Sequence, residues 1–337
     1  MTFTAKSSFK HEDQVSTGIL LTNLGTPDEP TKAALKRYLK EFLWDPRVVE
    51  EPRWKWWLIL NAVILNIRPA KSAMAYRSVW TDRGSPLMVH SLDQQEGLQE
   101  LLGDDVHVEL AMRYGNPSIA SALQRLREKG CTKILVFPLY PQYAAATTGS
   151  TFDAVADEFR QWRRVPELRM VSSYHDHPAY IDALAASVRK QWDAHGKPDR
   201  LLISFHGIPQ RYFDNGDPYP CMCRKTGRLL AEALALKEEE WLVSFQSRFG
   251  REAWVKPYTD ETLKTWGAEG VGHVDVICPG FSSDCLETIE EIEVENRDYF
   301  LEAGGSEFNY IPALNANGKH IRALAEIANA HLKGWID

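Results

Sequence analysis

Three glutamates, Glu287, Glu291 and Glu295, stand four residues apart near the carboxyl end of the chain. In a helix this spacing puts them on one face, where like charges destabilise the helix by roughly 0.2–0.5 kcal/mol per pair. A solvated acidic face is the usual explanation. Here, however, residues 274–278 form an apolar, β-branched run typical of a buried strand, and the acidic helix follows it. Open α/β sheets bind ligands at the carboxyl ends of their strands, so the position favours a path for a cation.

A histidine occupies a comparable position earlier in the chain. His206 ends the apolar run 201–205, and Gly207 and Pro209 then break the strand. A structural role is the alternative for a lone histidine, but an imidazole and a carboxylate in one cleft can bind a divalent metal or move protons. We therefore take His206 and the acidic helix as candidates for metal binding or proton transfer.

Composition limits the classes of protein to consider. The 337 residues suffice for two domains, and 44% hydrophobic with 25% charged residues is ordinary for a soluble globular protein. A net charge of −7 argues against nucleic acid as a partner. The polar first sixteen residues predict no secretory signal, and five scattered cysteines fit a reducing cytoplasm with free thiols. Cys221 and Cys223 lack the two-residue spacing of common metal motifs, so ligation by them is disfavoured.

Residues 54–68 combine three tryptophans with a long apolar run and the basic residues Lys55 and Arg68. The run is too short and too interrupted for a bilayer, which needs about 20 residues. Three interpretations remain open for it: a helix lying in a membrane interface, an apolar lip over a large flat ligand, or a buried core helix.

Strands and helices alternate along the chain, which predicts the α/β class. We expect strands at residues 19–23, 107–112, 133–138, 168–173, 201–205, 241–246, 274–278 and 308–312, and helices at residues 32–42, 117–129, 154–163, 180–193, 225–235, 259–268 and 319–332.

The two halves of the chain look alike. Residues 20–27 (LLTNLGTP) match residues 202–209 (LISFHGIP), so that Leu24 takes the place of His206. Further short matches follow in the same order, which predicts two four-stranded parallel units. We expect one domain at 17–178, a second at 179–317, and a helix at 318–337 that packs back on the first.

Nucleotide binding is disfavoured despite the fold class. The turn at residues 23–27 lacks the spacing of a dinucleotide fingerprint, and no P-loop occurs. Pro27 and Pro209 also remove backbone donors where a phosphate would need them.

Several motifs together resemble the ferrochelatase family, whose members insert ferrous iron into a porphyrin. They lie at residues 24–27, 112–115, 138–143, 147–150, 204–209, 216–220, 245–250 and 279–291. The resemblance covers nearly the whole chain. It implies two similar Rossmann-like domains, the class II chelatase-like fold, around a porphyrin cleft. Because members commonly lie on the cytoplasmic membrane surface, it also fits residues of about 40–85 as a hydrophobic lip.

The resemblance implies roles for single positions. His206 matches the active-site histidine and Glu287 its partner carboxylate, while Glu291 and Glu295 continue what looks like a metal relay. These four residues are the expected metal-binding set. Whether the histidine binds metal or accepts pyrrole protons stays open.

Five residues are expected to contact the porphyrin. Arg113 and Tyr114 match a pair that lines the family's cleft, and Tyr219 and Trp254 match aromatic residues near the macrocycle. Leu24, Tyr219 and Trp254 would supply apolar surface for the flat ring.

The expected reaction is insertion of ferrous iron into protoporphyrin IX, with release of two protons, to give protohaem. We expect no cofactor beyond the substrate iron. We also expect no iron–sulfur cluster, because no cysteine follows Cys285, whereas relatives with a cluster carry most of its ligands near the carboxyl end. Position 285 itself is a cysteine where animal members have a histidine.

Three alternatives remain: a coproporphyrin ferrochelatase, a non-catalytic porphyrin or haem carrier, and a two-domain solute binder, which the polar N-terminus disfavours. We expect a cytoplasmic monomer that contacts the membrane surface peripherally.

Overall fold

The computed structural model describes residue 3, residues 15–250 and residues 252–336. The expectation of no secretory signal concerns residues 1–16, and most of these lie outside the described residues. The chain divides into two compact units. The first unit comprises Met1–Leu139, Ala145–Ser172 and Leu324–Asp337, and the second comprises Tyr140–Ala144 and Ser173–Ala323.

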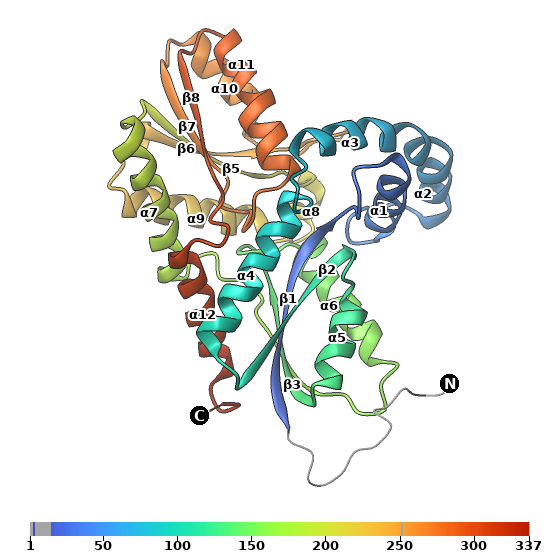
Figure 1. Ribbon diagram of the computed structural model, residues 1–337. Helices are drawn as coiled ribbons and strands as arrows, with labels where there is room; N and C mark the ends of the chain where they lie inside the picture. The colour runs from blue at the N-terminus through green and yellow to red at the C-terminus, as the bar shows by residue number, and fades with distance from the viewer. Residues whose placement is uncertain (1–2, 4–14, 251, 337) are drawn as a thin grey trace. The chain divides into compact units, whose positions relative to one another are not determined.

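The first unit is built on a parallel sheet of order β2-β1-β3-β4 (Figure 1). Its strands are β1 (Ser16–Thr26), β2 (Val106–Gly115), β3 (Cys131–Pro138) and β4 (Glu167–Met170). The central strand β1 pairs Leu21 with Leu110 on one side and with Phe137 on the other. Its run of buried residues reflects helices on both faces, as in most parallel sheets.

The helices of the first unit cover both faces of this sheet. They are α1 (Lys32–Trp44), α2 (Arg53–Ile59), η1 (Leu60–Ile64), α3 (Leu65–Val79), α4 (Pro86–Leu102), α5 (Ile119–Glu128), η2 (Ala145–Gly149) and α6 (Ser150–Phe159). Leu123 of α5 and Phe159 of α6 pack in one core cluster with Leu20 and Val136 of the sheet. Helix α4 lies on the opposite side of the strands from α5 and α6 (Figure 1).

The tryptophan-rich segment spans α2, η1 and the start of α3 in the first unit. One side of it is buried, since Trp56, Leu60 and Leu65 pack in a cluster with Leu43 and Val49. The other side is exposed and apolar. It presents Trp54, Trp57, Leu58, Val63, Ile67 and Met74, which we call the apolar surface of α2 and α3.

The second unit repeats the topology of the first. Its parallel sheet has the order β6-β5-β7-β8, with β5 (Arg200–His206), β6 (Trp241–Gln246), β7 (His273–Ile277) and β8 (Glu307–Ile311). In both sheets the first strand along the chain lies between the second and the third. The predicted pair of four-stranded parallel units is therefore confirmed.

Helices again lie on both faces of the second sheet. They are α7 (Pro178–His195), α8 (Gln210–Asp214), α9 (Tyr219–Ala233), η3 (Glu238–Glu240), α10 (Thr259–Ala268), η4 (Glu287–Asn296), α11 (Arg297–Glu302) and α12 (Gly318–Leu332). Leu263, Ile292 and Phe300 cover one face of the sheet. Helices α7 and α9 lie on the other side of the strands (Figure 1).

Helix α12 contributes to both units. Its first residues belong to the second unit, where Lys319 Nζ lies 2.7 Å from Asp182 Oδ2. Its end and the following tail belong to the first unit. There Arg169 bonds the carbonyl of His331 and stacks on the Trp335 ring, while Trp335 Nε1 donates to Glu167 at 2.7 Å. We call this group of contacts the C-terminal latch.

Candidate functional site

His206 is the last residue of β5, at the carboxyl edge of the second sheet. Its Nδ1 lies 2.7 Å from the carbonyl oxygen of Gly207. Because a carbonyl oxygen only accepts, Nδ1 must carry a proton and donate it to this bond. In the neutral ring this leaves the lone pair on Nε2, which is then available to a metal ion or to a proton.

Trp254 packs against the backbone that follows His206. Gly207 donates its N–H to the Gln246 carbonyl oxygen at 2.7 Å. A Cβ at Gly207 would lie 2.8 Å from that oxygen and 3.1 Å from Trp254 Cε3, so only glycine fits without movement. The Trp254 side chain is largely buried, and its Nε1 donates to the Phe249 carbonyl at 3.0 Å. The structure therefore brings Trp254 next to the strand end that carries His206.

Tyr219 begins helix α9 in the same unit and is buried. Its hydroxyl lies near Gly280, where a Cβ would stand 3.6 Å from the Tyr219 oxygen. Burial raises the pKa of Tyr219 well above its usual value, so the phenol keeps its proton at neutral pH. The side chain can thus offer an aromatic surface but no negative charge.

The acidic helix is a π-helix, η4, rather than an α-helix. Its backbone bonds run from i to i+5, a rare geometry that occurs frequently at functional sites. Glu287 is its first residue, and Gln246 Nε2 donates to the Glu287 carbonyl at 3.2 Å. Since Gln246 also pairs with His206 in the sheet, one residue connects the end of β5 to the start of η4.

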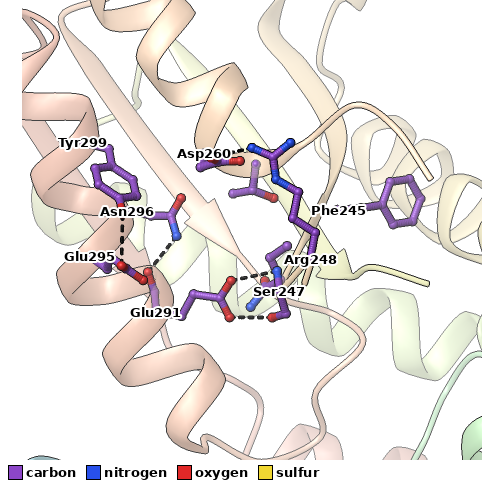
Figure 2. A pocket seen from close by; sticks show the side chains of 10 residues that line it. Phe245, Ser247, Arg248, Asp260, Glu291, Glu295, Asn296 and Tyr299 are labelled. Carbon is purple, nitrogen blue, oxygen red and sulfur yellow. Dashed lines mark hydrogen bonds and ion pairs between the residues drawn. The ribbon is translucent and has the colours of Figure 1, made fainter. Parts of the chain in front are cut away.

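The three glutamates differ in exposure: Glu287 and Glu291 are partly buried, whereas Glu295 is exposed. Ser247 holds Glu291 through its backbone N–H, 2.7 Å from Oε1, and through its hydroxyl, which donates to Oε2 (Figure 2). Burial raises the pKa of Glu291 to about 7, and the neighbouring Glu287 adds to the rise, whereas the bonds from Ser247 oppose it. Glu291 therefore exchanges a proton near neutral pH.

A small pocket of about 140 Å³ lies beside Glu291 and Glu295 in the second unit (Figure 2). Asp260, Asn296 and Arg248 also line it, and the Arg248 guanidinium lies 3.0 Å from Asp260 Oδ2. Asn296 donates from Nδ2 to the Glu291 carbonyl, but its buried Oδ1 accepts no hydrogen bond from the described residues. An acceptor left over in this way suits a cation or water in the pocket. Among the described residues, no three His, Cys, Asp or Glu side chains form a ready metal cage.

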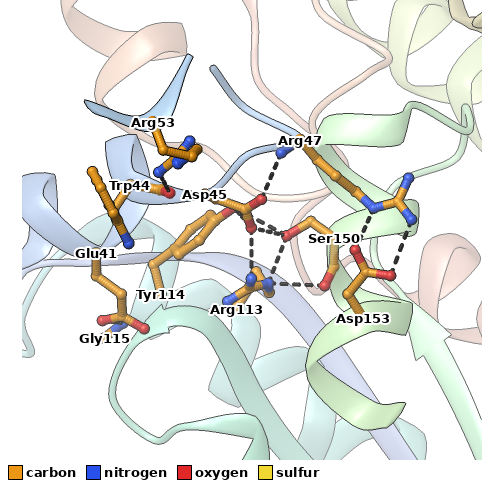
Figure 3. A network of polar contacts seen from close by, with 10 residues as sticks. All are labelled: Glu41, Trp44, Asp45, Arg47, Arg53, Arg113, Tyr114, Gly115, Ser150 and Asp153. Atoms are coloured by element: carbon orange, nitrogen blue, oxygen red, sulfur yellow. Dashed lines mark hydrogen bonds and ion pairs between the residues drawn. The ribbon is translucent and has the colours of Figure 1, made fainter. Parts of the chain in front are cut away.

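Arg113 and Tyr114 belong to a buried polar network in the first unit, near the end of β2 (Figure 3). Asp45 Oδ2 accepts from Arg113 Nη2 at 2.5 Å, from the Tyr114 hydroxyl at 2.9 Å and from Ser150 Oγ at 2.5 Å. Tyr114 is fully buried, and burial raises its pKa above the usual value. Leu24, also in this unit, is partly buried near the end of β1.

The structure thus groups the expected site residues into two sets. His206, Tyr219, Trp254 and the three glutamates lie in the second unit, and Leu24, Arg113 and Tyr114 lie in the first. Sequence analysis missed several of their partners, among them Asp45, Ser150, Ser247, Asp260 and Asn296. Ser150 and Ser247 stood within recognised motifs, at residues 147–150 and 245–250; the others depend on contacts between distant segments.

Comparison with known proteins identifies the family. The family model "Ferrochelatase" matches residues 16–332. The chain belongs to the ferrochelatase family. A ferrochelatase of Thioalkalivibrio sulfidiphilus is 60% identical over 99% of this chain and 92% of the relative. A ferrochelatase of Alcanivorax borkumensis is 54% identical over the full length of both chains. The family predicted from the motifs is therefore confirmed.

Solved structures agree on the fold. SirB from Bacillus subtilis, solved with Fe3+, matches with a TM-score of 0.56 and 12% identity, over 96% of this chain and 99% of that one. CbiX, described as the terminal enzyme of sirohaem biosynthesis in denitrifying bacteria, matches with a TM-score of 0.50 over 94% and 100%. At such low identity the likeness shows the chelatase-like fold alone. None of the described helices has the length and hydropathy needed to cross a bilayer.

Proposed function

We propose that the protein inserts ferrous iron into protoporphyrin IX, releases two protons and forms protohaem. Family membership supports metal insertion into a porphyrin. The single observation that carries the site assignment is the Nδ1 contact of His206 with Gly207, which leaves Nε2 as a free base at the edge of the second sheet.

In this proposal His206 accepts the protons that leave the pyrrole nitrogens. The hydrogen bond from Nδ1 to a carbonyl oxygen fixes the ring orientation and the tautomer. Glu287, whose backbone is tied to the neighbouring strand through Gln246, holds charge beside it. A general base of this kind contributes about 10²- to 10⁴-fold to a rate.

Glu291 and Glu295 would bind the ferrous ion and pass it on towards the porphyrin. Glu295 is exposed and Glu291 is partly buried, so the acidic face leads from solvent inward. Along it an ion can exchange its bound water for carboxylate oxygens in steps. The unpaired Oδ1 of Asn296 adds a neutral oxygen ligand beside them. Carboxylate and carbonyl oxygens suit divalent cations that must be released again.

In the second unit, the porphyrin would contact Tyr219 and Trp254. Trp254 and Tyr219 are held by packing against glycines, which limits their movement. Aromatic side chains fixed in this way offer a rigid face for a flat ring.

Anaerobic metal insertion tests this proposal directly. Ferrous iron and protoporphyrin should give turnover with the unaltered protein, and His206→Ala and Glu287→Gln should each lose about 10²-fold or more while still binding porphyrin. Glu293→Gln is the matched control, because Glu293 is exposed on the same helix. Turnover of both site variants at the unaltered rate would refute the assignment, and tight porphyrin binding without any turnover would identify a carrier. Coproporphyrin in parallel defines the preferred substrate.

We further propose that the protein is cytoplasmic and touches a membrane through the apolar surface of α2 and α3. Trp54 is 73% exposed and Ile67 68% exposed, with Lys55 and Arg68 beside them. Tryptophans next to basic residues suit the interface of an anionic bilayer. Sedimentation with phosphatidylglycerol vesicles should be lost in Trp54→Ser/Ile67→Ser, whereas equal sedimentation of both proteins would refute the contact.

We also propose a monomer that needs no iron–sulfur cluster or other cofactor. Four of the five cysteines are buried and only Cys221 is exposed, which supports their role as ordinary thiols. Sulfide and iron analysis of anaerobically purified protein should show neither in stoichiometric amount. Sedimentation velocity tests the oligomeric state.

A further inference from the structure

A buried carboxylate with no part in the reaction above lies just before η4. Asp284 is only 7% exposed. Its Oδ1 accepts three hydrogen bonds: from Thr288 Oγ1 at 3.0 Å, from the Tyr310 hydroxyl at 2.6 Å and from the Ala313 N–H at 3.2 Å. Among the described residues no Lys, Arg or His forms an ion pair with it, so neutral donors alone hold its charge.

Asn315 completes this arrangement with a pair of bonds. The Asp284 N–H donates to Asn315 Oδ1 at 2.8 Å, and Asn315 Nδ2 donates to Asp284 Oδ2 at 2.7 Å. Since the backbone N–H can only donate, it fixes which way the amide of Asn315 points. The amide nitrogen must therefore face the carboxylate.

The backbone of Asn315 is fixed as well. Its N–H donates to the Ser282 carbonyl at 3.0 Å, and its own carbonyl accepts from His320 Nδ1 at 2.7 Å. Its φ of +46° lies in the left-handed region, where asparagine and aspartate are several-fold enriched among non-glycine residues. The loop after β8 thus meets the loop before η4 in one defined way.

We propose that Asp284 is a positioning residue that, with Asn315, fixes the start of η4 and so the place of Glu287. The proposal rests on the role proposed for Glu287. Thr288, one residue beyond Glu287, is bonded both to Asp284 Oδ1 and to the Cys285 N–H, so the first turn of η4 is anchored from two sides. Donors from β8 and from the loop after it meet the same carboxylate.

A carboxylate three residues from Glu287 could instead carry protons. The contacts of Asp284 favour positioning, because its partners are a threonine, an amide side chain, a backbone N–H and a tyrosine. Burial raises the pKa of Tyr310 well above its usual value, so this phenol keeps its proton at neutral pH. None of the four donors passes protons onward at the pH of the reaction.

An exchange of the two side chains separates positioning from proton transfer. In Asp284→Asn the new amide nitrogen faces the amide nitrogen of Asn315, and in Asn315→Asp two carboxylates face each other. The double variant D284N/N315D restores one donor and one acceptor at the contact and moves the carboxylate to position 315. Aspartate tolerates the left-handed backbone there.

The kinetics of iron insertion give the readout, with unfolding temperatures measured alongside. Each single variant should lose about 10- to 100-fold in kcat with little change in KM for porphyrin, as expected for a misplaced catalytic group. The double variant should recover most of the kcat and of the unfolding temperature. Asp298→Asn, an exposed aspartate on α11, is the matched control and should behave like the unaltered protein.

Two results would overturn the positioning role. One is unaltered kcat in D284N. The other is a double variant that recovers the unfolding temperature but stays as slow as D284N, because the carboxyl group at position 284 itself would then be required. Absence of turnover by the unaltered protein would refute the proposed function, whereas normal turnover with failed rescue would refute only the positioning role.

Discussion

His320 gives a prediction about pH and stability. The side chain is fully buried, its Nδ1 donates to the Asn315 carbonyl, and its Nε2 lies 3.4 Å from Ser282 Oγ. Burial lowers its pKa from 6.5 to about 4, because the charged ring would lose its hydration. The folded protein therefore holds His320 neutral at a pH where the unfolded chain is protonated.

The sign and size of the effect follow from proton linkage. Between pH 6.5 and about 4 the unfolded chain binds one more proton at this site, so the free energy of unfolding falls as the pH falls. The contribution is complete above pH 6.5 and is lost on acidification to about pH 4. At about 1.4 kcal/mol per pH unit, the loss is about 3 kcal/mol.

Urea unfolding of the unaltered protein and of His320→Asn at several pH values between 7.5 and 4.5 measures this loss. Asparagine keeps a donor for the Asn315 carbonyl but does not titrate, so its stability should depend less on pH. Other groups titrate in both proteins, and the difference between the two curves isolates His320. His195→Asn is the control, since His195 is exposed at the end of α7. Curves that run parallel for the unaltered protein and H320N, or an NMR titration showing a ring pKa near 6.5, would refute the reasoning.

Three further outcomes are expected. Gly207→Ala should slow iron insertion at least about tenfold, because its Cβ meets the Gln246 carbonyl at 2.8 Å beside His206, whereas Gly318→Ala should not; equal rates would contradict the packing described. Glu291→Gln should raise KM for ferrous iron about tenfold and leave KM for porphyrin unchanged, with Glu293→Gln as control; a change confined to porphyrin would contradict the metal relay. Trp335→Ala should lower the free energy of unfolding by about 3 kcal/mol, because the C-terminal latch is lost. Thermal unfolding measures this change. Lys333→Ala, which keeps the backbone contact, should have no such effect.

The strands and several helices could be predicted from the sequence because their signals are local. Strand β6 and helix α10 lie at residues 241–246 and 259–268, as expected. Helix α9 begins at Tyr219, six residues earlier than predicted, because Pro220 lies in its first turn, where a missing N–H costs nothing.

The π-helical form of η4 could not be predicted, since nothing in the spacing of the glutamates separates i+4 from i+5 bonding. Gln246 binds the Glu287 carbonyl, and Tyr310 and Asn315 bind Asp284, from distant segments that only the folded chain brings together. Sequence did indicate His206 and the three glutamates, because their types and strand-end positions are visible locally. Ser247 and Asn315 act through partners more than 30 residues away.

The tryptophan-rich segment shows a different limit. Burial and exposure each describe one side of this segment: Trp56 and Leu60 are buried, and Trp54 and Trp57 are exposed. The π-helix η1 and Pro69 interrupt the regular α-helical repeat. The composition of the whole run therefore does not show which residues lie on the buried side and which on the exposed side.

The C-terminal latch also has a consequence for synthesis of the chain on the ribosome. The first unit takes its last contribution from residues 324–337, but its other residues are complete at residue 172. At about 5–20 residues per second, the intervening 151 residues take roughly 8–30 s to make. During that interval Glu167 and Arg169 of the edge strand β4 lack the tail that later binds them. The nascent protein therefore passes through a stage in which chaperone binding or pairing with another chain competes with completion of its own first unit.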